Sequence, residues 1–300
     1  MIKVDDFRPV TMADRTQFQE HYQRYPREHS EYLFTTLISW SHYTPAFCLH
    51  RDNNLVLMNM KEGKPQFRPP IGERNESLLK EVLGLARAKG GQRPVVAIDE
   101  AAKEWIESVL PGIALTEDRD YFDYVYLADD LVNLAGKAYL THRNRLNRFK
   151  KRYEYSVEEV SPKNIQDARE FLCRWCKHHG CDKNPLLEAE TNALLFCMDH
   201  FLELELSGIV LRLNDKIQAL SVYEAVNDST AAIHFEKAMP EFEGIYQAVN
   251  NEAAKLLVKR YKHINRESDL GIEGLRTAKE RLHPDHMVKV YFLDRGNIPA

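Results

Sequence analysis

The order of predicted helices and strands repeats once along the 300-residue chain. In each half, three short apolar stretches separated by turn residues predict three consecutive strands, followed by a helix, a strand, a second helix and a last strand. Helical sequence also precedes each set, at residues 12–39 and 162–204. Few residues are identical between the halves, so the repeat lies in the pattern alone. The pattern predicts an α/β chain made of two domains with the same topology.

Each domain is expected to contain a mixed, mainly antiparallel sheet flanked by helices. In the first half, strands are expected within residues 45–70 and at 94–100 and 121–129, with helices at 73–88 and 101–109. In the second half, strands are expected at 208–214, 216–226, 230–238, 263–268 and 287–293, with helices at 245–261 and 272–282. We therefore expect a first domain at residues 1–135 and a second at 136–300, and we expect the second to carry the active site.

Composition indicates a globular protein. Hydrophobic residues make up 44% of the chain and charged residues 29%, as in ordinary globular domains. No apolar stretch approaches the roughly 20 residues needed to span a bilayer, and the first residues, MIKVDDFRPV, lack an apolar signal core. Five cysteines, an odd number, argue against a disulfide framework and fit a reducing compartment. We expect a cytoplasmic protein.

Cysteines and histidines gather in one short segment, at Cys173, Cys176, His178, His179 and Cys181. This spacing resembles half of a zinc site. The alternative is a helix with Ala168, Leu172, Trp175 and His179 on its inner stripe, in which the cysteines fill small gaps. A closed zinc site needs four ligands, and a second Cys or His pair at finger spacing is missing. We favour the helix and expect no metal.

Seven basic residues and one acid lie between Gly136 and Tyr155, although the whole chain has a net charge of -4. Apolar residues in this segment recur at helical spacing, which predicts a helix over 137–153 with a basic outer arc. One interpretation is a phosphate-binding surface for a tRNA acceptor stem or an anionic lipid head group. The other is a solvated helix that links the domains. The candidate anion-binding residues are Arg143, Arg145, Arg148, Lys151 and Arg152.

A polar cluster is predicted where two strands of the second half lie side by side. Strand alternation places His234 and Glu236 on one face of residues 230–238, where such a pair can carry a proton. An ordinary cross-strand polar pair is the alternative. In residues 263–269, alternation places His263, Asn265, Glu267 and Asp269 on one face, opposite Ile264, Arg266 and Ser268. The candidate catalytic residues are His234, Glu236, Glu267 and Asp269.

The segment after residue 269 is interpreted as a wall of the same site. Gly271 permits a tight exit from the strand, and Gly274 would let the next helix approach a backbone or a ligand. With Leu275, Ala278 and Leu282 directed inward, we expect Arg276 and Lys279 to be free to meet an anion. The alternative is a solvated edge that leads into a surface helix. The candidate substrate-binding residues are Asn265, Arg266, Gly271, Glu273, Arg276 and Lys279.

The element order resembles that of the GNAT acyltransferase fold, and two copies in tandem resemble the peptidoglycan-bridge aminoacyltransferases and the synthase domain of phosphatidylglycerol lysyltransferase. Residues 137–153, 234–254 and 264–284 are similar to a bacterial family with a domain like the carboxy-terminal part of phosphatidylglycerol lysyltransferase. The resemblance covers nearly the whole chain. It implies a tandem GNAT-type transferase, with aminoacyl-tRNA as a candidate donor.

The turn that would bind coenzyme A departs from the GNAT pattern. In GNAT acetyltransferases this turn reads Arg or Gln, two residues, Gly, one residue, then Gly or Ala, and its backbone N–H groups meet the pyrophosphate. The equivalent residues here are 241–246. Gly244 is kept, but Glu241 replaces the Arg or Gln and Tyr246 replaces the small residue. Residues 69–72 of the first half fit no better. The sequence disfavours acetyl-coenzyme A in both domains, and we expect no cofactor.

The expected function is transfer of an aminoacyl group from aminoacyl-tRNA to an amine or hydroxyl of a lipid head group, peptide or small molecule. A carboxylate or His234 would position or deprotonate the nucleophile, and Glu267 or Asp269 would hold the α-ammonium group of the donor. Arg266, Arg276 and Lys279 would stabilise ester or phosphate charge. The alternatives are an acyl-coenzyme A-dependent N-acyltransferase with an altered cofactor turn, and a non-catalytic protein that binds RNA or an anionic ligand.

Overall fold

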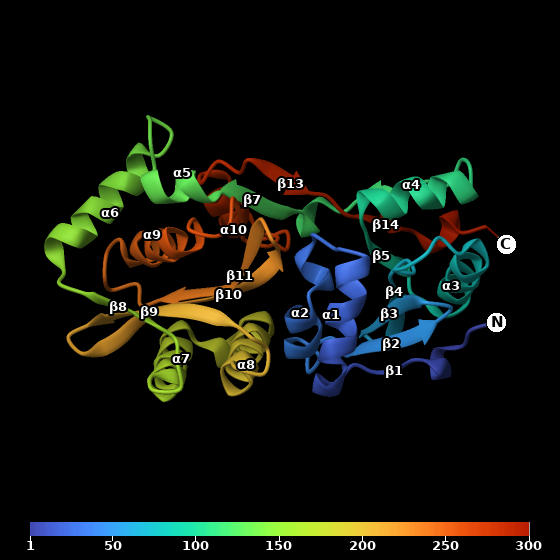
Figure 1. The fold of residues 1–300 in the computed structure, drawn as a ribbon, viewed down its shortest axis with the longest axis horizontal. Helices are drawn as coiled ribbons and strands as arrows, with labels where there is room; N and C mark the ends of the chain where they lie inside the picture. Colours follow the sequence, from blue (N-terminus) through green and yellow to red (C-terminus); the bar gives the residue numbers. More distant parts are fainter. Residues whose placement is uncertain (300) are drawn as a thin grey trace. The chain divides into compact units, whose positions relative to one another are not determined.

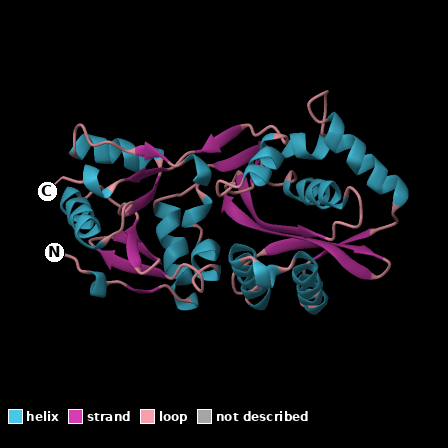
Figure 2. Cartoon of the chain, turned by 180° about the vertical axis from the view of Figure 1, so that it is seen from behind, coloured by secondary structure: helices cyan, strands magenta, loops and turns pink. Residues whose placement is uncertain are grey.

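The computed structural model describes residues 1–299 and divides the chain into two compact units. Unit 1 combines residues 1–122 with the segment from Val288 onward, and unit 2 comprises residues 123–287. Each unit has one mixed sheet, with seven strands among the described residues, and helices packed against it (Figures 1 and 2). This confirms the predicted fold class. Within residues 1–299, no helix is both long enough and apolar enough to cross a membrane.

The bounds of the two units differ from the predicted domains at 1–135 and 136–300. Strand β7 (Asp123–Leu127), expected to close the first sheet, instead pairs with β12 in the sheet of unit 2. The stretch expected as one strand at 287–293 forms two, and the second, β14 (Tyr291–Leu293), pairs with β5 in the sheet of unit 1. Alternation and β-branched content predict that a stretch is a strand, but they do not indicate which sheet it joins.

Unit 1 follows the predicted order closely. Its helices are α1 (Arg15–Arg24), α2 (Phe34–Ser39), α3 (Glu76–Lys89) and α4 (Glu100–Val109). Its sheet has the order β1 (Arg8–Pro9), β2 (Ala46–Arg51), β3 (Asn54–Lys61), β4 (Lys64–Phe67), β5 (Val95–Ile98), β14 and β6 (Thr116–Glu117). The turn between β2 and β3 has positive φ at Asp52 and Asn53, the geometry that a two-residue hairpin requires and that these residue types tolerate.

Unit 2 contains the helices α5 (Ala128–Asn133), α6 (Leu140–Arg152), α7 (Ile165–His179), α8 (Pro185–Asp199), α9 (Ile245–Leu257) and α10 (Glu273–Glu280). Its sheet has the order β13 (His286–Val288), β7, β12 (His263–Asn265), β11 (Thr230–Ala238), β10 (Lys216–Asn227), β9 (Ser207–Leu213) and β8 (Ser156–Glu159). Helix α9 covers one face of the sheet, and α7 and α8 cover the other (Figures 1 and 2). Ile245, Val249, Ala253 and Leu257 form the buried stripe of α9 at helical spacing.

Strands β11 and β12 run parallel and separate after a short contact. Their pairing runs from Thr230 with His263 to Ala232 with Asn265. Strand β11 continues to Ala238, whereas β12 ends at Asn265. Beyond that point, side chains must link the two segments, because the backbone pairing has ended.

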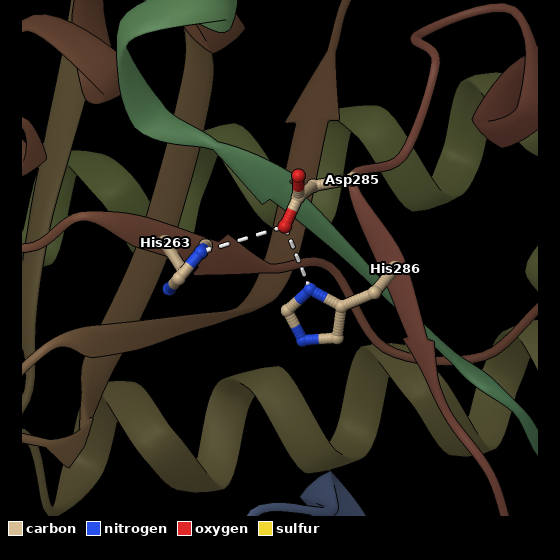
Figure 3. A group of neighbouring side chains, drawn as sticks. All are labelled: His263, Asp285 and His286. Carbon is tan, nitrogen blue, oxygen red and sulfur yellow. Dashed lines mark hydrogen bonds and ion pairs between the residues drawn. The ribbon is translucent and has the colours of Figure 1, made fainter.

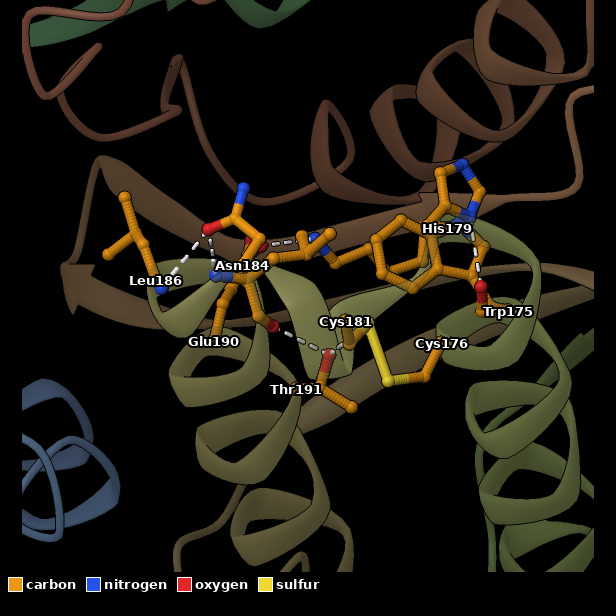
Figure 4. The surroundings of a disulfide bond; sticks show 10 residues. Trp175, Cys176, His179, Cys181, Asn184, Leu186, Glu190 and Thr191 are labelled. Carbon is orange, nitrogen blue, oxygen red and sulfur yellow. Dashed lines mark hydrogen bonds and ion pairs between the residues drawn. A yellow bond between two sulfur atoms is a disulfide. The ribbon is translucent and has the colours of Figure 1, made fainter.

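The helix predicted around the cysteines is present as α7, with Ala168, Leu172 and Trp175 buried. The ring of His179 stacks on Trp175, with 4.1 Å between ring centroids, but His179 itself is exposed. Cys176 and Cys181 form a disulfide across the end of this helix (Figure 4), which the odd cysteine count did not indicate. Of the remaining cysteines, Cys173 is exposed and the other two, Cys48 and Cys197, are buried.

Helix α6 packs against the start of α9, and Gly244 marks the contact. Gly244 has a φ of +90°, and a Cβ atom there would lie 2.6 Å from the backbone oxygen of Arg145 and 3.0 Å from Cβ of Phe149. The predicted apolar stripe of the basic helix is confirmed, because Leu146 and Phe149 are buried in the core that α9 shares. The N-cap residue of α9 therefore lies against α6.

We predict that Gly244→Ala lowers the free energy of unfolding by about 1–3 kcal/mol or more, since a non-glycine residue at this φ is strained even before the contact with Arg145. Urea unfolding measures this loss. Gly274→Ala is the matched control, because a Cβ at Gly274 meets nothing within 4 Å. Alanine in that helix should add about 0.5–1 kcal/mol. Equal effects at the two glycines would contradict the packing described.

Candidate functional site

His234 is the extra residue of a bulge in β11. Val222 pairs with Phe235 and Tyr223 with Ile233, so His234 is skipped in the register with β10. Bulges of this kind re-aim a side chain and are frequent beside functional sites. The imidazole is 3% exposed, with Nε2 at 2.7 Å from Oε1 of Glu224 and Nδ1 at 2.7 Å from Oε1 of Glu267. The bulge thus places the ring between two carboxylates.

The proton of this cluster resides on the imidazole. Burial lowers the pKa of His234, but the hydrogen bonds to Glu224 and Glu267 outweigh it and raise the pKa to about 10. Burial raises the pKa of the Glu267 carboxyl, and the imidazolium opposes that. The protonated imidazole donates one N–H to each carboxylate, Nε2–H to Glu224 and Nδ1–H to Glu267. An imidazolium has no lone pair to offer, so His234 positions carboxylates at neutral pH and is not the base that the sequence suggested.

Glu236 forms a second bridge between β11 and the segment after β12. Its Oε1 accepts a hydrogen bond of 2.8 Å from Nη2 of Arg266. The other oxygen, Oε2, is buried and has no hydrogen-bond partner within residues 1–299, and the same holds for Oγ of Ser221, its register partner on β10. Buried polar atoms without partners are uncommon and call for a proton, a water or a ligand. Glu236 is therefore the carboxylate of this group best placed to receive a proton.

The segment from Arg266 to Gly271 is not a strand, because positive φ at Glu267, Leu270 and Gly271 breaks the predicted alternation. Buried Asn265 holds it from one side. Its Oδ1 accepts the N–H of Glu267 at 2.7 Å, and its Nδ2 donates to Oδ2 of Asp123 at 2.8 Å. A non-glycine residue in this conformation costs about 1–3 kcal/mol and persists where its surroundings fix it. Asn265 thus sets the direction of the Glu267 side chain.

Lys279 braces the same segment from the other side, and the expectation that it is free to meet an anion is wrong. Its ammonium group donates to the backbone oxygens of Arg266, Glu267 and Ser268. Burial, together with the nearby Arg266 charge, lowers the pKa of Lys279 to about 8. Three backbone acceptors use all three of its N–H donors. Lys279 shapes the site without facing a ligand.

Asp269 and Arg276 also form a closed pair, so Arg276 is not free either. Asp269 is completely buried, and both its oxygens accept hydrogen bonds of 2.9 Å from the guanidinium group. Tyr124 Oη donates to it at 2.6 Å, and the N–H of Gly271 at 2.9 Å. Burial alone would raise the pKa of Asp269, but these donors outweigh it and lower the pKa to about 2. The pair fixes the turn at Gly271.

The predicted inward stripe of α10 is largely wrong. No residue of α10 is buried, Leu275 is 42% exposed and Ala278 is exposed; only Leu282, beyond the helix, is buried. Gly274 approaches no backbone, and Glu273 is exposed in the first turn. Helical spacing alone does not show that Arg276 and Lys279, and not the apolar residues, attach this short helix to the unit.

The basic residues of α6 divide into two groups. Arg143 turns inward and donates to the backbone oxygens of Leu134 and Gly136, which close the end of α5. Arg148 and Arg152 are exposed and lie 3.3 Å and 3.9 Å from the Glu243 carboxylate. Arg145 and Lys151 are exposed and form no ion pair with any described residue. Four of the five predicted anion-binding residues therefore face solvent, and Arg143 is structural.

Glu224, Asp123 and Tyr124 contribute to the cluster and were missed in the sequence. Glu224 lies on β10, and the hairpin at Asn227 could have placed it near β11, but the bulge that turns His234 toward it leaves no sequence signal. Asp123 and Tyr124 lie on β7, which was assigned to the other domain.

The chain has the fold of tandem GNAT proteins. A solved tandem GNAT protein from the clavulanic acid biosynthesis pathway aligns over 98% of this chain and 99% of its own, with a TM-score of 0.51 and 8% identity. The family described as phosphatidylglycerol lysyltransferase, C-terminal, matches residues 22–294. The chain belongs to this family, as its sequence resemblance predicted.

Two further solved structures share the fold over nearly the whole chain. A conserved protein of unknown function from Bacteroides thetaiotaomicron is 30% identical, with a TM-score of 0.87 and coverage of 96% of this chain and 98% of its own. L-PGS from Bacillus licheniformis is 14% identical, with a TM-score of 0.61 and coverage of 93% and 92%. None of the curated proteins matches the chain. Family and fold indicate an acyltransferase related to lysyl-phosphatidylglycerol synthase.

We predict that Asp269→Asn and Arg276→Ala each lower the free energy of unfolding by about 1–3 kcal/mol, because each leaves a hydrogen-bonding partner unsatisfied. Thermal or urea unfolding checks this, with Glu273→Gln on the same helix as a control that should change little. Unchanged stability in both variants would contradict a structural pair. It would return these two residues to the role of ligand contacts.

His234 should make stability depend on pH in a specific window. A group whose pKa is raised on folding contributes stability that is fully present below its unfolded pKa, here 6.5, and is lost as pH rises through about 10. The gap in unfolding free energy between the wild type and His234→Gln should therefore shrink from pH 6 to pH 10. Lys279 titrates in both proteins, so its effect cancels in the difference. A difference in unfolding free energy that stays constant from pH 6 to pH 10 would contradict a raised pKa at His234.

Proposed function

We propose that the chain transfers an aminoacyl group from aminoacyl-tRNA to an amine or hydroxyl acceptor at the divergence of β11 and β12. The observation that carries the proposal is Oε2 of Glu236, a buried carboxylate oxygen without a partner in residues 1–299. It lies beside the Arg266 guanidinium, which supplies a fixed positive charge. A proton acceptor next to a preorganised cation is what acyl transfer to a neutral nucleophile requires.

In this mechanism, the acceptor nitrogen or oxygen attacks the ester carbonyl carbon of the donor. A new C–N or C–O bond forms, and the bond from that carbon to the ribose oxygen breaks. Glu236 takes the proton of the nucleophile and returns it to the ribose oxygen as it leaves. Arg266 would stabilise the negative charge that develops on the carbonyl oxygen. Atoms and charge balance without a covalent enzyme intermediate.

The cluster of Glu224, His234 and Glu267 suits the α-ammonium group of the donor. Two carboxylates and one imidazolium leave one net negative charge, and the Glu267 side chain is 29% exposed. A cationic group that reaches this oxygen would be paired without displacing the imidazolium. Asn265 and Lys279 then act as positioning residues, since they fix the backbone of Glu267.

Weak binding of acetyl-coenzyme A is part of the proposal. A pyrophosphate needs open N–H groups at a helix start, whereas Gly244 at the start of α9 lies against the backbone of Arg145. Glu243, one residue earlier, adds negative charge where two phosphates would sit. Titration calorimetry with acetyl-coenzyme A separates this proposal from a coenzyme A-dependent transferase, for which micromolar binding is expected.

The transfer itself is tested with purified protein, tRNAs charged with labelled amino acids, and acceptors that include vesicles containing phosphatidylglycerol, the lipid named in the family description. Glu236→Gln should lower the rate by about 10²–10⁴-fold, the usual contribution of a positioned acid or base. Glu104→Gln, at an exposed position on α4 of unit 1, should transfer at the wild-type rate. Equal rates for wild type and Glu236→Gln would show that Glu236 is not the base. Failure to bind any charged tRNA would rule out aminoacyl-tRNA as the donor.

Binding of tRNA should depend on salt through α6. Replacing Arg145 and Lys151 with Gln should make the slope of log affinity against log salt less steep, by up to about 0.9 for each lost duplex phosphate contact. Replacing Arg148 and Arg152 should have a smaller effect, because both lie near Glu243. Lys163 and Lys216, both exposed in unit 2, serve as controls. An unchanged slope would make α6 a solvated helix.

A further inference from the structure

Two histidines and one aspartate that do not belong to the cluster around His234 meet at the β13 edge of the sheet of unit 2. His263 begins β12, and Asp285 and His286 lie at the start of β13. Figure 3 shows the Asp285 carboxylate between the two imidazole rings. Oδ2 of Asp285 is 3.5 Å from Nε2 of His263 and 2.9 Å from Nδ1 of His286. One ligand atom from each residue lies within 4.8 Å of the other two.

Strand β7 holds these residues in place. His263 is in register with Leu127 of β7, and the N–H of Asp285 donates to the backbone oxygen of Val125 at 2.8 Å. The N–H of His263 donates to the oxygen of Ser229 on its other side. Residues far apart in the sequence are thus fixed by backbone hydrogen bonds before any ligand arrives. Such preorganisation reduces the cost of binding.

We propose that His263, Asp285 and His286 bind one divalent transition-metal ion, with Zn²⁺ as the best fit. Two imidazole nitrogens and one carboxylate oxygen are a ligand set that Zn²⁺ accepts, whereas Mg²⁺ and Ca²⁺ take oxygen ligands. In a tetrahedral zinc site with bonds of about 2.0–2.1 Å, neighbouring ligand atoms lie roughly 3.3 Å apart. The separations of 2.9 Å and 3.5 Å bracket that value. The ion would replace the protons that now join the three groups.

The surroundings allow entry and a fourth ligand. His263 is partly buried, with its side chain 17% exposed, while Asp285 and His286 are 38% and 47% exposed. Water or an external ligand can therefore complete the coordination. Lys262 is exposed beside His263 and opposes the ion's charge, so Lys262→Gln should tighten binding. A bound ion would tie the edge strand β13 to β12 across β7.

The test uses the full chain, free of any histidine tag and treated with chelator, titrated with ZnCl₂ in a calorimeter. We expect one ion per chain. His263→Ala and His286→Ala should each weaken binding by more than about tenfold, since even the loss of a group that only orients a ligand costs that much. Co²⁺ should give a visible absorption band that both variants lose. Hydrogen exchange at β13 should slow when Zn²⁺ is added.

Two controls keep the test decisive. His42→Ala, an exposed histidine of unit 1, should bind as the wild type does. His178 and His179 are adjacent and exposed, with ring centroids 5.0 Å apart, and their double replacement by Ala should also leave binding unchanged. Circular dichroism confirms folding of each variant, and His286→Ala, at the exposed position, still tests the site if His263→Ala does not fold. Zinc binding that survives His263→Ala and His286→Ala, or that is absent in the wild type, would overturn the proposal.

Discussion

The site of unit 2 depends on charged side chains that replace backbone pairing where two parallel strands separate. After Ala232 and Asn265 the strands no longer exchange hydrogen bonds, and the bridges from His234 to Glu267 and from Glu236 to Arg266 span the opening. Burying a charge costs several kcal/mol unless it is paired. The pairs offset that cost, and they leave one carboxylate oxygen without a partner among the described residues. The charged side chains between the two segments are therefore held in a fixed arrangement.

The same constraint organises the chain that follows. Glu267 requires a left-handed backbone, and Leu270 and Gly271 share that conformation. Asn265 and Lys279 satisfy the backbone groups that such a segment exposes, and Asp269 anchors it through Arg276 and Tyr124. Most polar residues of this stretch thus hold Arg266 and Glu267 in position. A cluster built in this way exchanges stability for geometry, as sites with strained backbones commonly do.

The sequence predicts the elements of both halves well, because apolar periodicity and turn residues report local structure. It also predicts that His234, Glu236 and Glu267 lie on neighbouring strands, but strand alternation places Arg266 on the face opposite Glu267, whereas Arg266 bonds Glu236 in the structure. The sequence does not predict the features that depend on tertiary contacts. No local sequence pattern predicts the bulge at His234 or the contacts of Lys279 with backbone oxygens. Asp123 and Tyr124 lie on β7, and the position of β7 in the chain does not indicate that it joins the sheet of unit 2. The cluster of His263, Asp285 and His286 is invisible for the same reason.

The return of the chain to the sheet of unit 1 after unit 2 has a consequence for how the chain folds. Strand β7 begins unit 2, and β14 reaches the sheet of unit 1 only after all of unit 2 has been made. A ribosome therefore makes the strand β14 of unit 1 only after the whole of unit 2. Until then β5 and β6 lack the strand that joins them in the finished sheet, and unpaired strand edges are prone to aggregate. Unit 1 is thus completed only after unit 2 has been made.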